Sequence, residues 1–200
     1  MAAGPEPQAP ARVQRFSRAR RDPGLAVLEG FHALKHALRF GAEVVEIVAV
    51  DPAELDRLAA ELAPDLAGPL AARATPVGEE TLAELVPQAP RTGVVAIARR
   101  PAIDVAAALA DERSAPVVLL EDPRGMGNMG ACVRVAAAAD AAAVLTTGHN
   151  DPWNPEALRG AAGLHFALPV AAVEALPRGD RPLVAIDPEG EDLRPSELPP

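Results

Sequence analysis

The sequence has few of the features that mark secreted, disulfide-bonded or membrane proteins. Its one cysteine, Cys132, cannot form an internal disulfide bond in this chain of 200 residues. The apolar helical pattern around Cys132 favours packing over a reactive thiol. No apolar run approaches the roughly 20 residues that cross a bilayer, and the start MAAGPEPQAP lacks the charged and then apolar layout of a signal peptide. We therefore expect a cytoplasmic protein without a membrane partner.

Lysine is nearly absent, and acidic residues outnumber basic ones. Lys35 is the one lysine among 19 basic residues, and 28 acidic residues bring the net charge to −9. An acidic chain argues against a polyanionic partner, because nucleic-acid affinity comes largely from neutralising phosphates. However, residues 1–41 hold seven basic residues against three acidic ones. This asymmetry indicates either a basic region that contacts RNA or a solvated basic arm without a partner.

The hydrophobic pattern of the first half predicts a small α/β unit. Residues 1–11 are rich in proline and alanine without periodicity, which predicts a disordered tail. In the unit that follows, Asp51 and Pro52 suit the cap and the first turn of a helix. The expected strands and helices are 25–28, 44–50 and 93–98, and 31–40, 52–63 and 79–86.

The second half repeats the alternation of strand and helix. A fully apolar run at 117–120 is typical of a strand buried in a parallel sheet. The other elements expected are a linking helix within 104–115, helices at 130–139 and 156–162, and strands at 141–146, 164–170 and 183–186. We therefore predict two α/β domains, at 12–101 and 117–200, joined by a linker at 102–116.

A glycine triplet follows the apolar strand at 117–120. Gly125, Gly127 and Gly130 match the GxGxxG of a dinucleotide-binding turn, and Asp151 lies 21 positions beyond Gly130, where an acid could bind the ribose. Yet four residues separate the strand from Gly125, whereas the fingerprint turn follows its strand tightly. Asp151 also lies beyond the end of the second strand. An NAD-dependent oxidoreductase is therefore the less favoured hypothesis.

Several ordered motifs across about fifty residues match another family. They are Asp122-Pro123; the N-x-G-A-x-x-R of Asn128 to Arg134; the D-P-x-N-P of Asp151 to Pro155; and the R-x-x-x-G-x-x-F-x-L-P-V of Arg159 to Val170. Together they resemble the catalytic domain of the SpoU (TrmH) RNA methyltransferases of the SPOUT superfamily. Upstream, SRARRDPGLAVLEGFHALKHAL and RTGVVAIARRP resemble the substrate-binding domain that precedes it in many members.

This resemblance implies an RNA 2'-O-ribose methyltransferase with S-adenosylmethionine as methyl donor and rRNA or tRNA as substrate. It places Asn128 and Arg134 beside the reacting ribose as catalytic residues. We interpret Arg134 as orienting the substrate and stabilising charge, because a guanidinium with a pKa above about 12 is a poor base. From the residues alone, Asn128 could instead cap a helix, and Arg134 could be an ordinary surface arginine.

Other polar and aromatic residues allow two interpretations each. Four arginines are candidates for RNA binding, namely Arg12, Arg15, Arg18 and Arg159. Arg159 could equally lie in a solvated helical turn. Trp153 could stack on a base, although packing over its proline-rich turn is favoured. His32 and His36 are four residues apart as in some zinc sites, but no third ligand is evident, so no metal is predicted.

The three glycines of the triplet are expected to differ in role. Gly130 would allow a close approach of the backbone. Gly125 and Gly127 would be permissive turn residues.

The motifs that complete the family's cofactor pocket and trefoil knot have no match in the sequence. Family domains continue to a G-x-E-G-x-G-L motif and an I-P-M…S-L-N motif, whereas Asp187 to Gly190 is interpreted as the turn after a preceding strand. We therefore expect an incomplete SpoU-type domain that binds S-adenosylmethionine weakly or not at all. A non-catalytic RNA-binding short form is the alternative. The family implies a homodimer, partly through the same elements, and so gives no firm expectation of one for this chain.

Overall fold

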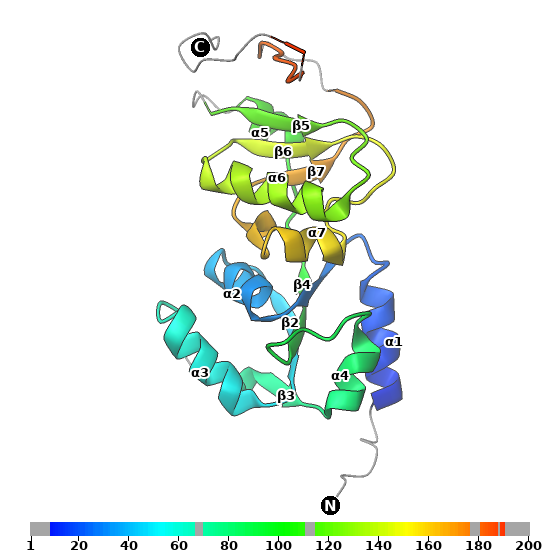
Figure 1. Ribbon diagram of the computed structural model, residues 1–200, viewed down its shortest axis with the longest axis vertical. Helices are drawn as coiled ribbons and strands as arrows, with labels where there is room; N and C mark the ends of the chain where they lie inside the picture. Colours follow the sequence, from blue (N-terminus) through cyan, green and yellow to red (C-terminus); the bar gives the residue numbers. More distant parts are fainter. Residues whose placement is uncertain (1–8, 67–69, 111–114, 177–180, 188, 191–200) are drawn as a thin grey trace, which may run out of the picture.

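The chain folds into two β-sheets, each covered by helices, that lie one beyond the other along the long axis of the molecule (Figure 1). The computed structural model describes residues 9–66, 70–110, 115–176, 181–187 and 189–190. The first sheet has the strand order β1-β4-β2-β3, and the second has the order β5-β6-β7. Both halves are thus α/β, as predicted from the alternation of strand and helix.

The first half is built on a mixed sheet. Strand β4 pairs antiparallel with β1 and β2, and β2 pairs parallel with β3. Asp51 caps α3 by accepting hydrogen bonds from the amides of Ala53 and Glu54, which confirms the predicted cap. The elements are α1 (Ala9–Ala19), β1 (Leu25–Glu29), α2 (Phe31–Arg39), β2 (Val44–Ala49), α3 (Pro52–Leu62), η1 (Ala71–Arg73), β3 (Ala74–Pro76), α4 (Glu79–Leu85) and β4 (Val94–Arg99).

The second half is built on a parallel sheet, as expected for a SPOUT-type domain. Helix α5 packs on one face of this sheet, and α6 and α7 lie on the other, toward the first half (Figure 1). The elements are α5 (Val105–Leu109), β5 (Val117–Leu120), α6 (Met126–Ala138), β6 (Ala143–Thr146), α7 (Pro155–Gly160), η2 (Leu164–Phe166) and β7 (Val170–Ala172).

One hydrophobic core joins the two halves. Phe31 and Leu34 of α2 share a cluster of buried residues with Leu158 of α7. The backbones also meet: a Cβ on Gly163 would lie 2.6 Å from the carbonyl oxygen of Ala33, so only glycine fits there. The predicted boundary at 102–116 therefore does not separate two independent cores. Part of that linker is α5, which packs on the second sheet.

Three predicted segments differ from the structure in kind, and not only in their bounds. Residues Ala9–Ala11 belong to α1 rather than to a disordered tail, because Phe16 and Ala19 of this helix are buried against the first sheet. The rest of that predicted tail, 1–8, lies outside the described residues. The strand predicted at 164–170 is a 3-10 turn after Gly163, which has a φ of +80°, and the strand starts only at Val170. Residues 183–186 form no strand.

Among the residues that the structure describes, no helix is both long and apolar enough to cross a membrane.

Candidate active site at the carboxyl ends of the parallel strands

The parallel sheet gathers the motif-bearing loops at one edge. The loop 121–125 follows β5 and leads into α6, and the loop 147–154 follows β6 and leads into α7. Both leave the carboxyl ends of parallel neighbours. In open α/β sheets ligands bind in the crevice outside these ends. This edge is therefore the candidate site.

The two loops are held together by several contacts. The amide of Asp122 donates to Oγ1 of Thr147 at 3.1 Å, and Nδ2 of Asn150 donates to the carbonyl oxygen of Pro123 at 2.9 Å. Asp122 has a φ of +39°, which is uncommon outside glycine but tolerated by aspartate. Gly148 has no room for a side chain beside Asp122. The loop that leads to Asn128 is thus fixed before any substrate arrives.

Both predicted catalytic residues lie on the exposed surface of α6. Asn128 is in the first turn, with its side chain folded toward Gly125, and Gly125 is the N-cap. The alternative of Asn128 as the helix cap is therefore wrong. Arg134 is exposed, and no hydrogen bond or ion pair joins it to any other residue that the structure describes. Six residues correspond to about 9 Å along a helix, so no direct contact brings Asn128 and Arg134 together.

The glycines of α6 serve its crossing with α7. A Cβ on Gly130 would overlap the carbonyl oxygen of Ala157 and lie 2.9 Å from the amide nitrogen of Ala161, which confirms the predicted close approach. A Cβ on Gly160 would likewise lie 2.9 Å from the carbonyl oxygen of Gly127. Gly127 is inside the helix, so its prediction as a turn glycine is wrong. Helix packing accounts for Gly130 and Gly160 without a dinucleotide.

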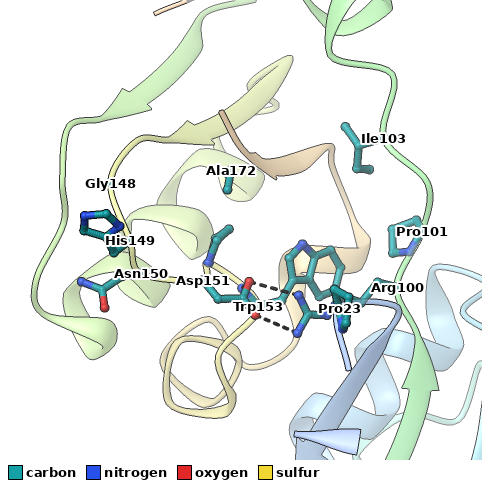
Figure 2. Close-up of a pocket in the computed structure, with 11 residues that line it drawn as sticks. Pro23, Arg100, Pro101, Ile103, Gly148, His149, Asn150, Asp151, Trp153 and Ala172 are labelled. Carbon is teal, nitrogen blue, oxygen red and sulfur yellow. Dashed lines mark hydrogen bonds and ion pairs between the residues drawn. The ribbon is translucent and has the colours of Figure 1, made fainter. Parts of the chain in front are cut away.

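A pocket of about 520 Å³ opens beside these loops (Figure 2). Its walls come from the turn after β6, the end of β7 and the segment after β4. They include Gly148, Asp151, Trp153, Ala172 and Ile103. The size is within the usual range for small-molecule sites. Neither Asn128 nor Arg134 lines the pocket, although the contact of Gly148 with Asp122 connects it to the loop before α6.

Arg100 and Trp153 form the floor of this pocket. The guanidinium of Arg100 pairs with the carboxylate of Asp151 at 2.8 Å, donates to the carbonyl oxygen of Leu25 at 2.6 Å and lies 5.9 Å from the centre of the indole ring. Figure 2 shows the two bonds that join Arg100 to Asp151. Trp153 is 5% exposed, and its Nε1 donates to the carbonyl oxygen of Val170. Packing, rather than stacking on a base, is thus confirmed for Trp153.

A buried histidine, His165, contacts the same turn. His165 is fully buried against Trp153, and its Nε2 lies 2.8 Å from the carbonyl oxygen of Pro152, which requires Nε2 to carry the proton. Its Nδ1 has no hydrogen-bond partner among the described residues. Burial lowers the pKa of His165 from its ordinary value of 6.5 to about 4.

We expect the chain to lose stability on mild acidification. The unfolded state binds a proton at His165 near pH 6.5, whereas the folded state resists it down to about pH 4. The free energy of unfolding should therefore fall by about 2 kcal/mol between pH 7.5 and pH 5. Urea unfolding followed by the fluorescence of the single tryptophan measures this loss.

The variant His165→Gln keeps a donor for Pro152 and cannot titrate, so it should flatten the pH dependence. Burial also lowers the pKa of His32 and His36, which leaves a smaller slope in the same direction. An unchanged slope in His165→Gln would contradict the assignment to His165.

The predicted RNA-binding arginines lie in different environments. Arg12 is 9% exposed and bonded to Glu46, so its side chain is withdrawn from the surface. Arg15 pairs with the same carboxylate at 2.8 Å and is 56% exposed, whereas Arg18 is exposed on α1. Arg159 is half-exposed and donates to Glu29 at 2.8 Å. Arg15, Arg18 and Arg159 are thus the candidates within reach of solvent.

Cys132 differs from its prediction, and His36 of α2 contacts the other half of the chain. Cys132 is exposed on α6, so the prediction that it packs in the interior is wrong. Nδ1 of His36 lies 2.7 Å from the carbonyl oxygen of Ala162 in the other half. The part of the chain that the structure describes holds no cluster of three or more potential metal-ligating His, Cys, Asp or Glu side chains.

Sequence reasoning missed Glu29, Arg100 and His165. Glu29 ends a strand and is 3% exposed, and Arg100 follows another strand and is 12% exposed on its side chain. The available signal for Glu29 and Arg100 is a charged residue at the end of an apolar strand. Their respective partners, Arg159 and Asp151, lie far away in sequence. No local pattern distinguishes His165 from a surface histidine.

Comparisons with known proteins agree with this geometry. Residues 115–197 match the model of the SpoU rRNA Methylase family. A stretch of 60 residues is 45% identical to rRNA methyltransferase 3A, mitochondrial, from Danio rerio, which is 29% of this chain and 14% of that protein.

Solved structures share the fold. The SpoU methyltransferase AviRb from Streptomyces viridochromogenes, in complex with the cofactor AdoMet, superposes with a TM-score of 0.65 at 23% identity, over 82% of this chain and 63% of that one. An RNA 2'-O ribose methyltransferase superposes with a TM-score of 0.60 at 24% identity, over 86% of this chain and 64% of that one. An AdoMet-bound rRNA methyltransferase from Sinorhizobium meliloti superposes with a TM-score of 0.62 at 22% identity, over 86% of this chain and 63% of that one.

The chain thus spans 14% of the curated relative and just under two thirds of the matched structures. The matched segment contains β5, α6, β6, α7 and β7, together with the loops at their carboxyl edge. Through this segment, the chain is similar to the SpoU rRNA Methylase family.

Proposed function

We propose that this protein is an RNA methyltransferase that transfers a methyl group from S-adenosylmethionine to a ribose 2'-hydroxyl of rRNA or tRNA in the cytoplasm. The observation that carries the proposal is the family match over residues 115–197 on a parallel sheet whose carboxyl edge holds the motif loops. The AdoMet-bound relatives support the identity of the donor. Among the residues that the structure describes, no contact favours the nicotinamide-dependent alternative.

The described pocket fits one side of such a cofactor. Pro101, Ile103 and Ala172 offer apolar surface for a nucleoside, and the turn at Gly148 and Asn150 offers backbone donors and acceptors. The positive charge of Arg100 is neutralised by Asp151, so it does not oppose a cationic group nearby. When bound, S-adenosylmethionine would supply the methyl group as an activated sulfonium substituent.

The chain's own residues would bind and orient the ribose. The side-chain amide of Asn128, at the start of α6, can donate to and accept from ribose hydroxyls. Arg134 can hold a phosphate of the bound strand with its planar array of donors and stabilise developing negative charge. Correct placement of the two reactants is the main contribution required, because positioning alone supplies much of the rate of a group transfer.

Deletion of the gene tests the proposal. We expect the source organism to lose a 2'-O-methyl group at a defined nucleotide of rRNA or tRNA and to regain it when the wild-type gene is returned. Alkaline hydrolysis maps the change, because a methylated 2'-oxygen cannot attack the neighbouring phosphate. A methylation pattern that is unchanged by deletion would contradict the proposal. If deletion removes a methyl group from a base instead, the acceptor is a base and not the ribose.

The homodimer that the family implies remains a separate prediction, which sedimentation velocity on the purified protein checks.

A further inference from the structure

A buried carboxylate joins the two halves of the chain. Glu29, at the end of β1, is 3% exposed on its side chain. Its Oε1 accepts from Nη2 of Arg20 at 2.6 Å, and its Oε2 accepts from Nη1 of Arg159 at 2.8 Å. Arg20 follows α1 and Arg159 belongs to α7, so one carboxylate connects three elements.

This group leaves one positive charge in excess, and the geometry places it at the surface. Two guanidinium groups share one carboxylate. The side chain of Arg20 is 20% exposed, whereas that of Arg159 is 48% exposed. Among the described residues, Glu29 is the one hydrogen-bonding and ion-pair partner of the Arg159 side chain, and it engages a single nitrogen. Since a guanidinium has five N–H donors, the remaining edge of Arg159 faces solvent with its donors free.

Arg159 also lies next to the crossing of α6 with α7. Gly160, its neighbour in sequence, approaches the backbone of Gly127, the neighbour of Asn128. Figure 1 shows the start of α6, the start of α7 and the end of α1 along the same side of the molecule. The backbone that carries Arg159 is therefore close to the first turn of α6, which carries Asn128.

From this arrangement, we propose that Glu29 is a positioning residue that holds Arg159 ready for an RNA phosphate and so couples the first half of the chain to the methyltransferase site. The inference rests on the proposed function, because it takes RNA as the substrate. A guanidinium fixed on one edge loses less entropy when its other edge forks onto a phosphate.

RNA affinity tests the proposal without cofactor or turnover. The probe is fluorescein-labelled poly(U), measured by anisotropy over a range of salt concentrations at a temperature where tryptophan fluorescence shows each variant to be folded. Arg159→Ala should weaken binding roughly tenfold and reduce the slope of log Kd against log salt by about 0.7. Glu29→Gln should weaken binding in the same direction.

The sign of the Glu29→Gln effect separates positioning from general charge. Removing a carboxylate makes the protein less acidic, which by itself strengthens binding to a polyanion. Glu43→Gln is the matched control, because Glu43 is an exposed partner of Arg99 and loses the same charge. It should bind RNA as well as the wild type or slightly better. Glu29→Asp keeps the charge, but its side chain is one methylene shorter, so it should also weaken binding. This variant replaces Glu29→Gln in the test if Glu29→Gln does not fold.

A double variant separates positioning from a structural role. If Glu29 acts through Arg159, adding Glu29→Gln to Arg159→Ala should cause no further loss of affinity. Folded Glu29→Gln and Glu29→Asp that bind like Glu43→Gln, or a further loss in the double variant, would overturn the inference while leaving the methyltransferase proposal intact. A wild-type protein without salt-sensitive RNA binding would overturn both.

Discussion

Replacing Arg134 with alanine is expected to reduce methylation about 100-fold or more while leaving the protein folded. Removing one group that stabilises charge in a transition state costs roughly that factor in other enzymes. Arg134 is exposed and makes no hydrogen bond or ion pair with another described residue, so the free energy of unfolding should change by no more than about 0.5 kcal/mol. Loss of activity could therefore be attributed to the reaction itself.

Complementation measures this effect. The deletion strain receives either the wild-type gene, Arg134→Ala, or the control Arg57→Ala, and the extent of 2'-O-methylation is compared. Arg57 is 75% exposed on α3, where its partner is Glu54 of the same helix, so its loss should leave methylation unchanged. Full restoration by Arg134→Ala would exclude both the orienting and the charge-stabilising role.

Replacing Gly130 with alanine should give the largest loss of stability for a single methyl group. The added Cβ would overlap the carbonyl oxygen of Ala157 and crowd the amide of Ala161, so α6 and α7 would have to separate. Overpacking of this kind costs about 3 kcal/mol, which corresponds to a fall in Tm of roughly 10 °C for a chain of this size. Thermal unfolding followed by circular dichroism measures it.

Gly127 supplies a control of opposite sign on the same helix. A Cβ there would meet its nearest atom, Oε1 of Glu156, at an ordinary 3.8 Å. Because alanine is favoured over glycine in a helix by about 1 kcal/mol, Gly127→Ala should raise Tm slightly. Equal effects of the two substitutions would mean that the contact between α6 and α7 is not as close as the structure has it.

The secondary structure was predictable wherever the local pattern was strong. Strand Val117–Leu120 was predicted to the residue, since an apolar run with turn signals is sufficient. Helix α6 was predicted four residues too late, because Gly127 and Gly130 in its first turns have poor helix propensity. The close approach of the α7 backbone explains Gly130, and α7 is distant in sequence. The family motifs located the site loops in advance, since those motifs are contiguous segments.

By itself, the sequence determined the α/β class, the order of the elements and the resemblance to the SpoU family, all of which depend on local periodicity and short motifs. Only the tertiary structure decided which charges pair. In the structure, Arg12 is buried and pairs with Glu46, and Arg100 pairs with Asp151. Glu29 pairs with both Arg20 and Arg159. Such pairs depend on distance in space and on burial. Arg20 and Arg159, which share Glu29, lie in different halves of the chain. Packing between these halves therefore sets the electrostatics of the site.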